Sequence, residues 1–223
     1  MAIRQDNRQP ALWVRLLMAA AGLIVFTAGI YVTLRSNIGI SPWDILSMGI
    51  SKQTRLSFGE AALIVSSVIL VLDLLAGERI GPGTILDVVI TGKGIDLFLV
   101  WDPLPLQTTI VTGILCMLAG LFLMALGQRI YMQQALGCGP RDLLLIALGK
   151  RIRRVPIGLV QTVILGTVIA SGWMLGGDVG IGTLVSFFGM GSIMQVVFFA
   201  SGRFDPRAVV HDSFRTLYAG GGV

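Results

Sequence analysis

Two four-residue motifs, residues 41–44 (SPWD) and 139–142 (GPRD), combine a helix start with a carboxylate in a very hydrophobic chain. Each motif has serine or glycine at the N-cap, proline at the first helical position and aspartate two residues later. One interpretation is that Asp44 and Asp142 only cap their helices, which stabilises each helix by about 0.3–1 kcal/mol. The other is that two short helices converge inside a membrane and present their N-terminal ends to a permeating solute.

The second motif differs from the first beside its aspartate, where Arg141 stands in place of Trp43. If the two motifs meet, a cation and an aromatic ring flank a common path, which suits an anionic or zwitterionic solute. The alternative is that Arg141 is a cytoplasmic charge that only orients the chain during insertion into the membrane.

Further charges interrupt an apolar run before residue 100, namely Asp87, Lys93 and Asp96. The spacing of Lys93 and Asp96 permits an ion pair within one helix, and the alternative is a polar lining of the path. The candidate lining residues are therefore Asp44, Asp142, Pro42, Pro140 and Arg141, with Trp43 and Asp96 behind them.

The composition of the chain is that of an integral membrane protein. Of its 223 residues, 54% are hydrophobic and 13% are charged, whereas soluble domains carry about 25% charged residues. Mean hydropathy is +0.83. The net charge of +5 comes from Lys and Arg that lie between apolar runs, where basic residues set orientation. We therefore expect the lipid bilayer, and no nucleic acid, as a partner.

The chain contains an internal repeat that carries both motifs. Residues 37–56 return as residues 135–154 with glycine, proline, aspartate, lysine and arginine in register. Upstream, Gly22 and Gly29 match Gly120 and Gly127, and downstream a further set of glycines matches after a shift of one residue. Two related halves that face each other across a path are typical of channels and secondary transporters.

Each half is predicted to form a long helix, a short apolar segment and two more helices. The long helices are expected over residues 12–34 and 106–129. The short segments span only a few helical turns, and at about 1.5 Å per residue they cannot cross a hydrocarbon core of about 30 Å. Irregular backbone at membrane depth needs protein or water around it, so these segments are expected inside the bundle.

The predicted fold is an all-α polytopic membrane bundle of two homologous halves. Three spanning helices and one short half-helix or re-entrant helix per half make an inverted repeat, and the alternative is a parallel repeat of four plus four. Charge favours inversion, because the first half begins with Arg4, Arg8 and Arg15 whereas the linker before the second half has Asp102 and no basic residue. The expected divisions are a cytoplasmic N-terminal segment (1–11), membrane repeats (12–101 and 107–200) joined by a linker (102–106), and a cytoplasmic tail (201–223).

No enzyme motif is found in the sequence. It has no nucleotide-binding loop, no HExxH or GxSxG motif and no clustered Cys and His residues. Neither catalysis, a metal nor a cofactor is therefore expected. Cys116 and Cys138 have neither the number nor the spacing of a disulfide framework.

The leading functional hypothesis is a small-solute permease or channel whose central path is lined by the SPWD and GPRD motifs. One alternative is a membrane scaffold that regulates a biosynthetic or sensory partner, with the basic residues 150–154 binding a cytosolic protein or anionic lipid. Another is the substrate-binding subunit of a multi-component transporter. A homo-oligomer is compatible with each of these hypotheses.

The segment GISPWD, which contains Gly39, Pro42, Trp43 and Asp44, is followed by a basic turn, the sequence LSFG and a helix that leads to GxxIGxGT. This pattern resembles the YczE/YyaS/YitT group of bacterial membrane proteins between about residues 29 and 199. The resemblance implies a multi-spanning protein of the bacterial cytoplasmic (inner) membrane, but no substrate. The second copy of the motif departs from the group pattern at residues 139 and 141.

Overall fold

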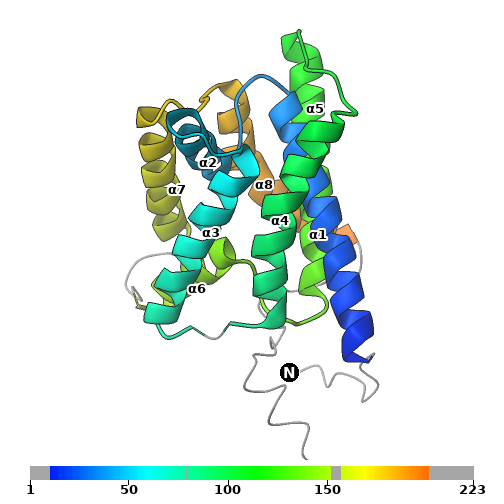
Figure 1. Ribbon diagram of the computed structural model, residues 1–223, viewed down its shortest axis with the longest axis vertical. Helices are drawn as coiled ribbons and strands as arrows, with labels where there is room; N and C mark the ends of the chain where they lie inside the picture. The colour runs from blue at the N-terminus through cyan, green and yellow to red at the C-terminus, as the bar shows by residue number, and fades with distance from the viewer. Residues whose placement is uncertain (1–10, 79, 152–156, 201–223) are drawn as a thin grey trace, which may run out of the picture.

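The computed structural model describes residues 11–78, 80–151 and 157–200, and within these ranges the chain is helical without strands (Figure 1). Eight helices follow one another in the described chain. They are α1 (Leu12–Arg35), α2 (Pro42–Gln53), α3 (Phe58–Leu75), α4 (Pro82–Trp101), α5 (Ile110–Met132), α6 (Pro140–Arg151), α7 (Ile157–Met174) and α8 (Ile181–Ala200).

The helices differ in their capacity to cross a membrane. Within the described chain, α1, α3, α5 and α8 are long and apolar enough to span a bilayer. Helix α4 has 20 residues but carries three charged residues, and α7 has a shorter apolar stretch, Leu159–Met174. Helices α2 and α6 have 12 residues each, so neither can span the hydrocarbon core alone.

Helices α1 and α5 pack along each other and cross at glycines. A Cβ atom on Gly29 would lie 2.7 Å from the carbonyl oxygen of Gly120, and one on Gly120 would lie 2.8 Å from that of Gly29. Gly22 and Gly127 approach each other in the same reciprocal way. Since the early glycine of α1 meets the late glycine of α5, the two helices run antiparallel (Figure 1).

The loop before each short helix is fixed to the last helix of the other half. The amide of Gly182, at the start of α8, donates to the carbonyl of Ile38 at 2.7 Å. In the corresponding position, the amide of Gly83 in α4 donates to the carbonyl of Leu136 at 2.8 Å. These two bonds hold the approaches to α2 and α6 inside the bundle.

A glycine follows each of these carbonyls and makes the turn into the short helix possible. Gly39 and Gly137 have φ angles of +117° and +115°, a conformation that side chains with a Cβ rarely adopt. Proline at the first helical position then starts α2 and α6. The short helices pack against the other half as well, α2 on α7 and α6 on α3.

Candidate functional site

The N-terminal ends of α2 and α6 lie next to each other in the interior of the molecule. The Nη1 atom of Arg141 is 3.6 Å from the Oδ1 atom of Asp44. The guanidinium carbon of Arg141 lies 5.6 Å from the centroid of the Trp43 ring. The residue pair that distinguishes the two motifs is therefore in direct contact across the junction between the halves.

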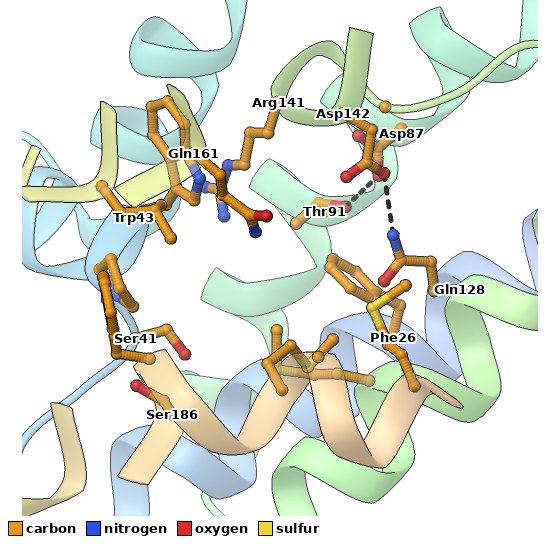
Figure 2. Close-up of a pocket in the computed structure, with 18 of the residues that line it drawn as sticks. Phe26, Ser41, Trp43, Asp87, Thr91, Gln128, Arg141, Asp142, Gln161 and Ser186 are labelled. Atoms are coloured by element: carbon orange, nitrogen blue, oxygen red, sulfur yellow. Dashed lines mark hydrogen bonds between the residues drawn. The ribbon is translucent and has the colours of Figure 1, made fainter. Parts of the chain in front are cut away.

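A cavity of about 410 Å³ opens beside this junction (Figure 2), a size that suits a small molecule. Its lining comes from both motifs and from most of the helices. The lining residues are Phe26, Ser41, Pro42, Trp43, Ser66, Asp87, Thr91, Met124, Gln128, Tyr131, Gly139, Arg141, Asp142, Gln161, Thr162, Leu165, Ser186, Phe187, Phe188, Met190, Gly191 and Met194.

Asp142 is held at one end of the cavity by two uncharged donors from α5. The side-chain amide of Gln128 donates to its Oδ2 atom at 2.8 Å, and the hydroxyl of Tyr131 donates to the same atom at 3.3 Å. The Tyr131 oxygen also accepts from the amide of Gly139 at 3.3 Å. Helix α5 thus fixes both the carboxylate and the residue that precedes α6.

Asp87 of α4 lies beside Asp142 (Figure 2). Its Oδ1 atom accepts a hydrogen bond from the Thr91 hydroxyl at 3.1 Å. A Cβ atom on Gly139 would lie 2.7 Å from the Oδ2 atom of Asp87. A serine at position 139 would therefore require Asp87 to move.

At the other end of the cavity, the side chain of Ser41 is buried and unpartnered. The residue is 8% exposed, and its hydroxyl makes neither a capping bond to α2 nor any other hydrogen bond. Ser186 lies near it in Figure 2 and donates to the carbonyl of Thr183 at 2.9 Å. Ser41 is therefore a buried hydroxyl with capacity for a partner in the cavity.

The two aspartates of the motifs have different partners, and Asp44 makes no capping hydrogen bond in this structure. Asp44 is 1% exposed, and neither of its carboxylate oxygens has a hydrogen-bond partner. Asp142 accepts from the side chains of α5 described above. The immediate environment of Asp44 is instead the guanidinium of Arg141.

The remaining candidate residues are divided between the cavity and the packing around it. Pro42, Trp43, Arg141 and Asp142 line the cavity, whereas Asp44 and Pro140 are buried behind it. Asp96 is not among the lining residues.

Asp96 holds the start of α3. It accepts from the Ser57 hydroxyl at 2.5 Å and from the Gly59 amide at 2.7 Å. The carboxylate therefore faces the N-terminus of α3 and not Lys93, with which its spacing permits an ion pair.

Sequence reasoning did not assign Gln128, Tyr131 and Thr91 to the site. Each is a polar side chain in a hydrophobic helix, and Gln128 and Tyr131 are three residues apart, so they share a helix face. The sequence therefore shows that Gln128 and Tyr131 lie on one face of their helix. Their position opposite Asp142 depends on how α5 packs, which no local pattern specifies.

The interface between α3 and α4 and the corresponding interface between α7 and α8, called seams below, are packed differently. Helices α3 and α4 are in close contact, and a Cβ atom on Gly92 would lie 2.9 Å from that of Leu63. Gly191 of α8, the counterpart of Gly92, has no such neighbour within 4 Å and lines the cavity. Within the described chain, α7 and α8 are not in extended contact. The cavity therefore reaches between α7 and α8.

The described side chains contain no group of three or more His, Cys, Asp or Glu residues that could hold a metal ion.

Comparison with known proteins agrees with the membrane character of the chain. A relative from Bacillus subtilis, the "Uncharacterized membrane protein YczE", is 29% identical over 182 residues, which cover 78% of this chain and 81% of the relative. A second Bacillus subtilis relative, the "Uncharacterized protein YyaS", is 29% identical over 178 residues, which cover 78% of this chain and 88% of the relative. An "Uncharacterized protein" from Haemophilus influenzae is also 29% identical, with coverage of 82% and 81%.

No solved structure gives a significant match to the chain. The apolar helices and the relatives together identify an integral membrane protein. The model of a "Family of unknown function (DUF6198)" matches residues 13–198. The chain therefore belongs to the DUF6198 family, and its resemblance to the YczE/YyaS/YitT group is confirmed.

Proposed function

We propose that this protein is a small-solute permease or channel of the bacterial inner membrane, and that the cavity between α2 and α6 is its solute site. The observation that carries the proposal is a cavity with charged side chains in its lining at the meeting point of two half-helix N-termini. Ionisable side chains inside membrane proteins are costly to bury and commonly mark solute or ion pathways. Half-helices that end near the middle of the bilayer form such sites in transporters.

The proposal includes an inverted repeat of three spanning helices and one half-helix in each half. The reciprocal contacts of Gly22 with Gly127 and of Gly29 with Gly120 support it, because equivalent residues exchange places across an antiparallel pair. The paired bonds from Gly182 to Ile38 and from Gly83 to Leu136 follow the same exchange. A parallel repeat of four plus four requires α1 and α5 to run in the same direction.

An inverted repeat gives the cavity a means of changing access. One seam, α3 against α4, is closed, while its counterpart, α7 against α8, is open to the cavity. If the two seams exchange these arrangements, the same cavity opens by way of the other half. In this mechanism both termini are cytoplasmic and no catalytic step is needed.

Flux through purified protein in liposomes tests this function. A panel of small anions, neutral solutes and cations should contain at least one solute that crosses faster than in protein-free liposomes. Asp142→Asn should change that flux while the thermal unfolding midpoint stays close to that of the parent protein. Asp178→Asn is the matched control, because Asp178 is exposed and pairs with Lys52 away from the cavity.

Two results would contradict the proposal. One is the absence of flux for the whole panel with protein that is folded and inserted. The other is stable copurification of a partner that is released when the basic residues 150–154 are neutralised, which identifies a scaffold instead. A partner with ATPase activity that restores flux identifies a transporter subunit.

A further inference from the structure

The charges around the cavity are unequally distributed between its two ends. Asp87 and Asp142 lie side by side at one end (Figure 2). Of the lining residues, only Arg141 is basic, and its guanidinium already faces the buried carboxylate of Asp44. The expected anionic or zwitterionic solute depended on a free positive charge at Arg141, and the ion pair with Asp44 removes that reason.

The hydrogen-bond donors to Asp87 and Asp142 are uncharged. Asp142 accepts from Gln128 and Tyr131, and Asp87 accepts from Thr91. Neutral donors satisfy part of the hydrogen-bonding capacity of a carboxylate but supply no positive charge. The guanidinium of Arg141 acts electrostatically on Asp44, Asp87 and Asp142 together, so one positive charge is shared among three carboxylates. In a cavity within a membrane protein, a positively charged group is the partner that such a pair of carboxylates favours.

A second observation, independent of the carboxylates, points to a ligand in the same cavity. The Ser41 hydroxyl lines the cavity, is more than nine-tenths buried and has no hydrogen-bond partner. It lies at the end opposite to Asp87 and Asp142 (Figure 2). A solute that reaches it needs a group that can donate or accept a hydrogen bond.

We propose that the cavity binds a small organic cation whose positive group lies at Asp87 and Asp142 and whose polar group reaches toward Ser41. The inference rests on the proposed function, since it names the solute class of the same cavity. The cavity volume of about 410 Å³ is large enough for a small organic molecule. Asp87 and Asp142 select the charge, and Ser41 selects the polar end.

Three probes of one size and different charge test the selection of charge. Glycolate, ethylene glycol and ethanolammonium share a two-carbon skeleton with a hydroxyl group, and they are an anion, a neutral molecule and a cation. Binding to purified protein is measured by titration calorimetry, and flux is measured in liposomes. Ethanolammonium is expected to bind at least about tenfold more tightly than glycolate.

Substitutions test which residues select the charge and the hydroxyl group of the solute. Asp87→Asn and Asp142→Asn should each weaken ethanolammonium binding about 10- to 100-fold, the usual range for a hydrogen bond to a charged group. Asp178→Asn, outside the cavity, should bind as the parent protein does. Ser41→Ala should abolish the preference for ethanolammonium over ethylammonium, which lacks the hydroxyl group.

The outcomes separate this inference from the proposed function. Glycolate or ethylene glycol binding as tightly as ethanolammonium overturns the cation inference, as does no binding of ethanolammonium at millimolar concentration. Flux of any panel solute in that case leaves the permease proposal intact. Binding of ethanolammonium that depends on Asp87 and Asp142, without flux of any solute, supports the site and contradicts the permease. If an asparagine variant does not fold, the ranking of the three probes on the parent protein decides.

Discussion

The contact between Arg141 and Asp44 joins the two short helices through one buried ion pair. Asp44 is almost completely buried, and its carboxylate oxygens have no hydrogen-bond partner to compensate for their loss of water. A buried pair of this kind contributes little net stability, since desolvation offsets the attraction. Removal of one partner is different, because it leaves a buried charge without compensation. The pair therefore ties the folding of the two halves together.

A double-mutant cycle measures this coupling. Arg141→Gln is expected to destabilise the protein by about 3–5 kcal/mol, because it leaves the buried Asp44 carboxylate without its positive partner. Asp44→Asn should cost less, because Arg141 lines the cavity and still faces Asp87 and Asp142. The double variant should lose less than the sum of the two single losses. Denaturant unfolding in detergent micelles gives the three values. Additive losses would show that the two side chains do not interact in the folded protein.

At the scale of the elements, the cavity depends on a difference between two equivalent glycines. Gly92 is pressed against α3, and Gly191 faces the cavity without a close neighbour. A side chain introduced at Gly92 must force α3 and α4 apart, and overpacking of this kind costs about 1–3 kcal/mol. A side chain at Gly191 has room in the structure described here.

A pair of matched substitutions tests this difference between the seams. Gly92→Leu is expected to lower the thermal unfolding midpoint in detergent. Gly191→Leu is expected to leave the midpoint nearly unchanged but to reduce solute flux, because leucine occupies the cavity and opposes closure of α7 on α8. Equal destabilisation by both substitutions would mean that the α7–α8 seam is packed as tightly as the α3–α4 seam.

The helices were largely predictable from the sequence, but their partners were not. The first helix was expected over 12–34 and extends over Leu12–Arg35, because a long apolar run between basic residues leaves little choice. The helix expected over 106–129 instead occupies Ile110–Met132, since Thr109 accepts from the Thr112 amide and fixes the start of α5. Pro42 and Pro140 likewise predicted the starts of α2 and α6.

Part of the site could also be read from the sequence, and the remainder required the packing. The repeated motifs identified Trp43, Arg141 and Asp142, which line the cavity. Asp96 has the same sequence signal, a charge in an apolar helix, but it stabilises the start of α3. Hydropathy cannot separate these cases, because the direction in which each residue faces depends on which helices are neighbours.

At the scale of the whole molecule, two ion pairs of the described residues lie at one end, away from the interior pair of Arg141 and Asp44. Lys52 pairs with Asp178 at 2.6 Å, and Arg35 pairs with Asp102. Both pairs join an early helix end to a later loop, so basic residues at this end are matched by acidic ones. Arg15 lies at the opposite end, beside the carbonyl of Gln134.

The orientation of the two halves can be measured at equivalent positions, Gln53 and Arg151, which end α2 and α6. In a variant without Cys116 and Cys138, a cysteine is introduced at either position and labelled with a membrane-impermeant maleimide. An inverted repeat with a cytoplasmic N-terminus places Gln53→Cys outside, so it should be labelled in intact cells. Arg151→Cys should be labelled only after the cells are permeabilised. Labelling of both positions on the same side would instead establish a parallel repeat. The two halves would then not be related by a two-fold axis in the membrane plane, so the α3–α4 and α7–α8 seams could not exchange their arrangements.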